Sequence, residues 1–187
     1  MFFRISLLLI ALTLPVARAE VSSAAPTGFV VQHGAQISAP RDLAWRLLVG
    51  HVSDWWHPDH TYSGDATNLS IDARALGCFC EQLDGDDAVV HMQVTLIRTP
   101  SLLRLTGGLG PLGLRGVDGN LVFVLSETET GTLVELKYAV GGYDPDGLDQ
   151  IAPAVDAVLG EQLTRFVRLV ETGNADLPQS EAVEEDG

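Results

Sequence analysis

Basic residues are scarce in this chain. Its 187 residues include 11 lysines and arginines against 25 aspartates and glutamates, which gives a formal net charge of −14 at pH 7. A surface of this sign repels polyanions, so the composition argues against nucleic acid as a partner and is compatible with a neutral or basic ligand. Residues 175–187 are rich in acidic side chains and poor in large apolar ones, which predicts a disordered acidic tail.

Long apolar runs are absent after the first twenty residues. Arg4 precedes an apolar run from Ile5 to Val16 that is too short to span a bilayer, and Ala17-Arg18-Ala19 matches an A-x-A cleavage site. We therefore expect a signal peptide over residues 1–19, cleavage after Ala19, and an exported mature chain that is periplasmic or secreted, with no membrane span. Loss of Arg4 and Arg18 with the leader takes the formal charge from −14 to −16.

Signatures of catalysis and of nucleotide binding are also missing. Ser63 has no G-x-S-x-G setting, and the glycine-rich segment 106–116 lacks the ending and the following helix of a phosphate loop. We therefore expect no cofactor and assign no catalytic residue. Leucines on this glycine-rich backbone favour a mobile apolar flap between two strands, and a merely long hairpin loop is the alternative.

What the chain does contain is an ordered series of strand and helix patterns. Residues 20–27 are expected to be a leader, and residues 28–174 suit one domain with a substantial core. Alternation predicts a first strand over 29–37, and helical spacing predicts short helices over about 39–49 and 51–56. Short turns then predict an antiparallel meander. Its expected strands are 68–72, 77–83, 89–98, 102–106, 120–127 and 132–140, with Val90, Met92, Val94 and Leu96 on one buried face.

The segment 147–172 has the clearest pattern in the chain. Its apolar residues recur at three- and four-residue spacing on one stripe, and most of its charged residues lie away from that stripe. Pro153 limits where a regular helix can begin, and Gly173-Asn174 supplies a stop. The expected fold class is therefore α+β: a curved antiparallel sheet of about seven strands around a long C-terminal helix, with two short helices after the first strand.

This order of elements, together with particular residues, resembles the helix-grip superfamily of START lipid-transfer domains, polyketide cyclases and chaperone activators, abbreviated SRPBCC. The resemblance covers residues 29–172 and implies a cavity for an apolar ligand between the sheet and the long helix. The resemblance rests on three sequence features: a helix start, a pair of tryptophans, and a glycine at the beginning of a strand. None of these is a catalytic signature. They read Ile37-Ser38-Ala39-Pro40 before Trp45, Val52-Ser53-Asp54-Trp55-Trp56, and Leu76-Gly77-Cys78-Phe79-Cys80-Glu81.

The candidate ligand site combines this implied cavity with the unusual residues of segment 51–65, its best candidate rim. Apolar burial would supply the binding free energy, and a few polar groups would fix the orientation of the ligand. His33 is the titratable group on the apolar face of the first strand, with Asp54 and Glu81 as candidate partners. The cavity and rim candidates are His33, Trp55, Trp56, His60, Tyr62, Met92, Leu109, Leu112, Phe123, Tyr138, Leu159 and Phe166.

Two groups of side chains have ligand types that metal ions prefer. His57, Asp59 and His60 could bind zinc, but Pro58 removes a regular spacing, so we expect a loop packed by tryptophans and no metal. Cys78 and Cys80 share one face of a strand, and we expect them to pack as small apolar thiols. An intrastrand disulfide formed after export is one alternative, and Cu(I) held together with His91 and Met92 is another.

The expected function is that of an exported binding protein for a small hydrophobic ligand, either a lipid or an aromatic, polyketide-like molecule. The alternative is an enzyme of the cyclase or dehydratase type acting in the same cavity. Two titratable groups within reach of one another and facing the cavity would favour catalysis, whereas an apolar lining would favour storage or transport. Partner binding, as in the chaperone activators, predicts an exposed apolar patch, and the expected export weakens it. The sequence predicts no oligomeric state.

Overall fold

The computed structural model describes residues 20–176, which form one eight-stranded antiparallel sheet and three α-helices. The strand order across the sheet is β1-β2-β8-β7-β6-β5-β4-β3. The strands are β1 (Glu20–Ala25), β2 (Gly28–Ile37), β3 (Leu69–Ile71), β4 (Cys78–Gln82), β5 (Ala88–Arg98), β6 (Leu102–Thr106), β7 (Gly116–Thr128) and β8 (Gly131–Tyr143). The α-helices are α1 (Arg41–Gly50), α2 (Val52–Trp55) and α3 (Ala152–Thr172).

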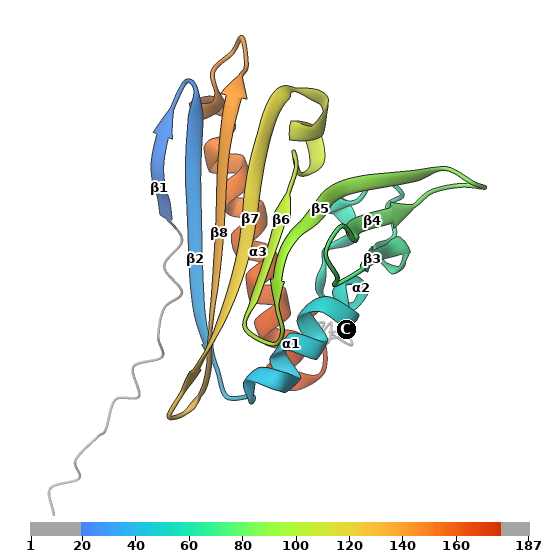
Figure 1. Ribbon diagram of the computed structural model, residues 1–187, viewed down its shortest axis with the longest axis vertical. Coiled ribbons are helices and arrows are strands. Elements are labelled where there is room, and N and C mark those ends of the chain that lie inside the picture. Colours follow the sequence, from blue (N-terminus) through green and yellow to red (C-terminus); the bar gives the residue numbers. More distant parts are fainter. Residues whose placement is uncertain (1–19, 177–187) are drawn as a thin grey trace, which may run out of the picture.

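This architecture confirms the predicted α+β fold class. Helix α3 runs along one face of the sheet against β2, and α1 and α2 lie near its C-terminal end (Figure 1). The strands from β3 to β8 follow one another as the predicted meander, while β2 pairs with β8 and so joins the two ends of the chain in the sheet. The predictions for residues 1–19 and 177–187 lie outside the described residues.

Strand β1 is an addition to the expected sheet. Its small and polar residues gave no alternating pattern, so the segment was expected to be a leader. In the structure it pairs antiparallel with β2, with Val21 opposite Val31, and a bulge follows Val21. The backbone of an edge strand can pair without a strong side-chain pattern, because the ladder is formed by main-chain groups.

Helix α3 begins next to Pro153 and ends before Gly173, as the sequence predicted. Leu148–Gln150 forms a separate 3₁₀ turn, and the regular helix starts at Ala152 with Pro153 in its first turn. Proline is tolerated there because the first helical N–H groups have no partner inside the helix. Gly173 adopts a left-handed conformation and its N–H bonds to the carbonyl oxygen of Leu169, which terminates the helix.

The core fills the space between the sheet and α3, and an aromatic cluster closes one end of it. Trp55 and Trp56 of the α2 segment are both buried. The Trp55 ring centroid lies 5.6 Å from that of Phe166 on α3, and the Trp56 centroid lies 5.1 Å from that of Phe79 on β4. Edge-on contacts of this kind add to the free energy gained by burial, so the tryptophan pair ties the short helix to both layers.

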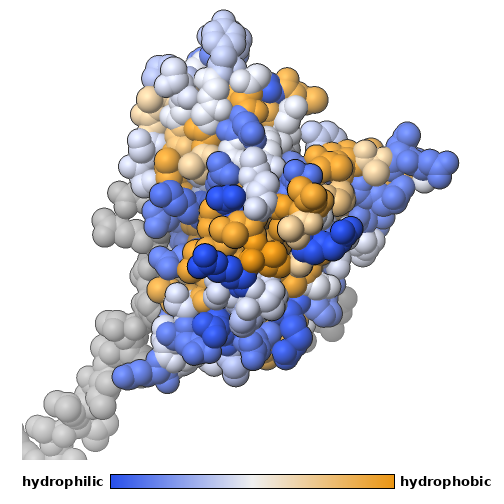
Figure 2. All heavy atoms as spheres, viewed as in Figure 1, coloured by the Kyte–Doolittle hydropathy of each residue, from blue (hydrophilic) through white to orange (hydrophobic). Residues whose placement is uncertain are grey.

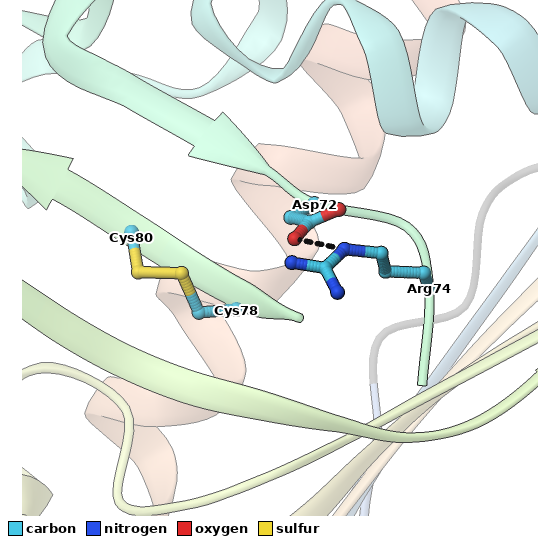
Figure 3. Close-up of a disulfide and its surroundings, with 4 residues drawn as sticks. All are labelled: Asp72, Arg74, Cys78 and Cys80. Carbon is cyan, nitrogen blue, oxygen red and sulfur yellow. Dashed lines mark hydrogen bonds and ion pairs between the residues drawn. A yellow bond between two sulfur atoms is a disulfide. The ribbon is translucent and has the colours of Figure 1, made fainter. Parts of the chain in front are cut away.

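Cys78 and Cys80 form a disulfide within β4 (Figure 3), which corrects the expectation of two packed thiols. Residues two apart in a regular strand are roughly 6.6 Å apart. Here the register of β4 against β5 shifts between Phe79 and Cys80, and the two cysteine Cα atoms are 5.4 Å apart, inside the usual range for a disulfide. Because both sulfurs are bonded, the alternative of a copper site with thiolate ligands is wrong.

The helices of residues 20–176 include none that is long and apolar enough to cross a lipid bilayer.

Candidate functional site: a pocket between the sheet and helix α3

A pocket of about 390 Å³ lies between helix α3, the loop joining β6 to β7, and the inner face of the sheet. On the face shown in Figure 2, apolar side chains gather across the middle of the molecule, and hydrophilic ones border them below. The helical wall of the pocket comes from the first turns of α3, where residues spaced three and four apart share one side. These residues are Ala154, Val155, Val158 and Leu159, together with Ile151 directly before the helix.

The glycine-rich loop forms a second wall. Its residues Gly110–Leu114 fold into a 3₁₀ turn, in which Leu112 is buried in the core and Leu114 is 84% exposed beside the pocket. Tyr138 fastens this loop: its hydroxyl accepts from the Leu109 N–H at 3.0 Å and donates to the Gly107 carbonyl at 2.9 Å. The expected flap is therefore a short turn held by hydrogen bonds to β8.

Burial changes the acidity of this tyrosine. Removal from water raises the pKa of Tyr138 to about 12, and the hydrogen bond from Leu109 opposes the rise only in part. The phenol therefore stays neutral at physiological pH and can donate to Gly107 while it accepts from Leu109. The hydroxyl of a second tyrosine, Tyr62, donates a hydrogen bond to the carbonyl oxygen of Gly110 in the same loop at 3.2 Å.

Aromatic rings form the third wall and contain a buried histidine and carboxylate pair. Glu81 on β4 is fully buried, and its carboxylate accepts from the backbone N–H groups of Tyr62 at 3.0 Å and Ser63 at 2.6 Å. The Nε2 atom of His91 on β5 lies 2.9 Å from the same carboxylate. The His91 ring lines the pocket between Tyr62 and Phe79, with ring centroids 5.7 and 5.1 Å away.

The charge state of Glu81 follows from these contacts. Burial alone would raise the pKa of Glu81, but the hydrogen bonds from Tyr62, Ser63 and His91 together outweigh it and hold the pKa below its usual value. The carboxylate is therefore ionised at neutral pH and can only accept hydrogen bonds. It follows that Nε2 of His91 carries a proton and donates a hydrogen bond to Glu81.

The sequence singled out His91 only as a possible copper ligand, and a bulge is the reason that its place in the pocket wall was not predicted. Phe79 pairs with Met92 and Cys80 with Val90, so His91 has no residue opposite it. This extra residue turns the strand, and both His91 and Met92 are buried while Val90 is 66% exposed. The expectation that Val90 shares a buried face with Met92 is therefore wrong. Regular alternation gave no signal for the bulge.

His33 lies under helix α3 rather than in the pocket. Its Nε2 is 2.9 Å from the Asp156 Oδ1 atom, a contact at ion-pair distance in which neither atom has an aligned hydrogen bond. A Cβ at Gly160 would lie 2.9 Å from the His33 ring, so the helix approaches the strand closely here. His33 thus contacts Asp156, and the proposed partner Glu81 bonds to His91 instead.

The twelve candidate residues divide evenly between the pocket and its surroundings. Six of them line the pocket: Trp56, His60, Tyr62, Leu109, Tyr138 and Leu159. The other six lie buried outside the pocket lining: His33, Trp55, Met92, Leu112, Phe123 and Phe166. The candidate list did not include His91, Phe79 or the first turn of α3, all of which line the pocket.

His57 and His60, at the rim of the pocket, each contact a neighbouring residue. His57 accepts the Asp59 N–H through Nδ1 at 3.1 Å, and Nε2 of His60 lies 3.1 Å from a carboxylate oxygen of Glu161. Within residues 20–176, no group of three or more His, Cys, Asp or Glu side chains is arranged to hold a metal ion.

Comparison with known proteins identifies solved structures that share the fold of this chain. No family model matches the chain, and no curated protein matches it. Among solved structures, a conserved protein of unknown function from Enterococcus faecalis matches with a TM-score of 0.58 and 19% identity, covering 89% of this chain and 82% of its own. A protein from Chromobacterium violaceum matches with a TM-score of 0.54 and 15% identity over 76% of this chain and 96% of its own.

DynU16, a protein of the dynemicin biosynthetic locus, matches with a TM-score of 0.55 and 15% identity over 78% of this chain and 48% of its own. The chain has the helix-grip fold. At these identities the likenesses show the fold alone. In this helix-grip chain the pocket lies where the resemblance implied a cavity, between the sheet and the long C-terminal helix.

Proposed function

We propose that this chain binds a small hydrophobic molecule in the pocket between helix α3 and the sheet. The observation that carries the proposal is the lining, in which aliphatic side chains of α3 and the loop face a wall of aromatic rings. Burial of apolar surface would supply most of the binding free energy. The volume of about 390 Å³ lies near the lower end of the range of roughly 300–1,000 Å³ for small-molecule pockets, which suits two or three fused rings or a short chain.

The comparison with DynU16 supports an aromatic or polyketide-like ligand over a long-chain lipid. That protein comes from a biosynthetic locus, and it shares the helix-grip fold with this chain. The number of rings in the pocket wall is a second support, because offset and edge-on contacts between aromatic groups favour a flat ligand.

A pocket-filling variant tests the proposal. Val158 faces the pocket, and the neighbouring Ala157 on α3 is exposed and outside it. We expect N-phenyl-1-naphthylamine, a neutral fluorescent probe, to bind the wild-type protein with a rise in emission. Val158→Trp should weaken this binding by at least roughly tenfold, since an indole would occupy the space of the probe. Ala157→Trp is the matched control and should bind as the wild type does. Equal binding by all three proteins would contradict the proposed site.

The His91–Glu81 pair favours a second candidate, an enzyme of the cyclase or dehydratase type that acts in the same pocket. The unprotonated Nδ1 of His91 would take a proton from the carbon next to a ketone, the electrons of that C–H bond would form the enolate, and Glu81 would stabilise the resulting imidazolium. Deuterium exchange into the methyl group of 2-acetylnaphthalene tests this step. Acceleration by the wild type and not by His91→Phe is expected, and exchange at the buffer rate would exclude it.

We also propose that the chain is exported and meets its ligand outside the cytoplasm. The leader composition and the disulfide support this, because disulfides persist in oxidising compartments. Edman sequencing of the protein from its native host should begin at Glu20, and an intact Met1 would contradict the proposal.

A further inference from the structure

The buried pair fixes which nitrogen of His91 is available to a ligand. Glu81 is ionised and accepts from Nε2, so a neutral His91 has its lone pair on Nδ1. No hydrogen bond to this Nδ1 atom is found among residues 20–176, although the His91 ring is almost completely buried and lines the pocket. An imidazole nitrogen on the pocket wall without a protein partner can accept a hydrogen bond from a donor on a ligand.

Apart from the exposed Asp59, the other polar side chains of the pocket wall each make a hydrogen bond. The Tyr138 hydroxyl is bonded to Leu109 and Gly107, and the Tyr62 hydroxyl donates to Gly110. The hydroxyl of Thr61 donates to the carbonyl of Pro58 at 2.7 Å. The Tyr62 hydroxyl oxygen can still accept a hydrogen bond, but its proton is held by Gly110. Nδ1 of His91 is a nitrogen acceptor on the aromatic wall to which no described residue donates.

The charges around the pocket point to a neutral ligand. Among the described residues that line the pocket there is no lysine or arginine, but there is one aspartate, Asp59, and Glu161 lies next to His60 at the rim. Behind the aromatic wall, the buried Glu81 carboxylate is bonded to His91. A carboxylate or phosphate on the ligand would meet the like charges of Asp59 and Glu161, so an anionic head group is disfavoured here.

We propose that the pocket selects neutral ligands with a hydroxyl group, of the phenol or enol type, which donate a hydrogen bond to Nδ1 of His91. This inference rests on the proposed function and specifies its substrate class. Glu81 acts as a positioning residue, since it holds His91 in the tautomer that leaves Nδ1 free.

Three naphthalenes of similar size test the proposal by isothermal titration calorimetry. We expect 2-naphthol to bind the wild-type protein roughly tenfold more tightly than 2-methoxynaphthalene, which has no proton to donate, and 2-naphthoate to bind more weakly than both. His91→Phe keeps a ring between Tyr62 and Phe79 but has no acceptor, so the preference for the hydroxyl should disappear. Tyr62→Phe removes a hydroxyl that is bonded to Gly110 and should keep the preference.

A measurement on the wild-type protein keeps the proposal testable if His91→Phe does not fold. Long-range ¹⁵N–¹H correlation spectra should show His91 protonated at Nε2 and unprotonated at Nδ1, and 2-naphthol should shift Nδ1 where 2-methoxynaphthalene does not. A proton on Nδ1, or equal affinities for the two probes, would overturn the inference and leave the pocket intact as a binding site. Failure of every naphthalene and of N-phenyl-1-naphthylamine to bind would overturn the proposed function itself.

Discussion

Replacement of Glu81 with glutamine tests whether the buried carboxylate organises this wall of the pocket. Glutamine has nearly the same shape, but its amide nitrogen cannot accept a hydrogen bond. One carboxylate oxygen accepts from Ser63, and the other accepts from Tyr62 and His91. Whichever side the amide nitrogen takes, it faces at least one backbone N–H, and two donors then meet.

The hydrogen bonds of Glu81 determine how much stability the Glu81→Gln substitution should remove. Loss of a hydrogen bond to a charged group costs about 1.5–3 kcal/mol, and a buried donor left without an acceptor costs about 1–3 kcal/mol. We therefore expect Glu81→Gln to lower the free energy of unfolding by about 3 kcal/mol. Glu129→Gln, in the exposed turn between β7 and β8, is the control and should change it by less than about 0.5 kcal/mol.

Urea denaturation followed by circular dichroism at several pH values measures this difference. The folded-state pKa of Glu81 lies below its unfolded value, so the carboxylate contributes stability above the unfolded pKa of about 4.3. That contribution is lost as the pH falls through the folded pKa. The gap between wild type and Glu81→Gln should thus be largest near neutral pH and shrink in acid. Equal stability of Glu81→Gln and Glu129→Gln at pH 7 would refute this reasoning.

Three further predictions concern the loop, the helix contact and the disulfide. Tyr138→Phe should speed hydrogen exchange at the Leu109 amide and lower the free energy of unfolding by about 1–2 kcal/mol, and unchanged exchange would contradict this. In the wild-type protein, the phenol of Tyr138 should ionise near pH 12 in an ultraviolet titration. Gly160→Ala should destabilise by about 1–3 kcal/mol because its Cβ meets the His33 ring, and the same change in a His33→Ala background should not. The denatured protein without reductant should titrate no free thiol.

The long helix and the meander could be predicted because their signals are local and repeated. The apolar stripe of segment 147–172 can be recognised even if the ends of the helix are misplaced by a residue or two. Pro153 and Gly173 mark these ends, because proline is tolerated only in the first turn and glycine readily adopts the left-handed conformation that terminates a helix. Strand β1 could not be predicted, since its small residues carry no pattern and its position depends on the free edge of β2. The sequence indicated that tryptophans pack this segment, but the contacts of Trp55 with Phe166 and of Trp56 with Phe79 were not predicted.

The pocket was harder to predict than the fold. Whether a buried side chain lines a cavity or fills the core depends on packing at the level of single ångströms, and Phe166 and Leu159 have the same signature in sequence. The position of His91 depends on one bulge, which reverses the facing of a single residue. Glu81 could be named as a candidate partner, but its partner could not be identified without the register of β4 and β5.

The most direct test of the central claim is a crystal structure of the wild-type protein with N-phenyl-1-naphthylamine. Binding in the pocket predicts ligand density between α3 and the aromatic wall, in contact with Val158 and Leu159 on one side and with Phe79 and His91 on the other. Density for the probe only on the outer surface, with these side chains closed upon one another, would contradict the account.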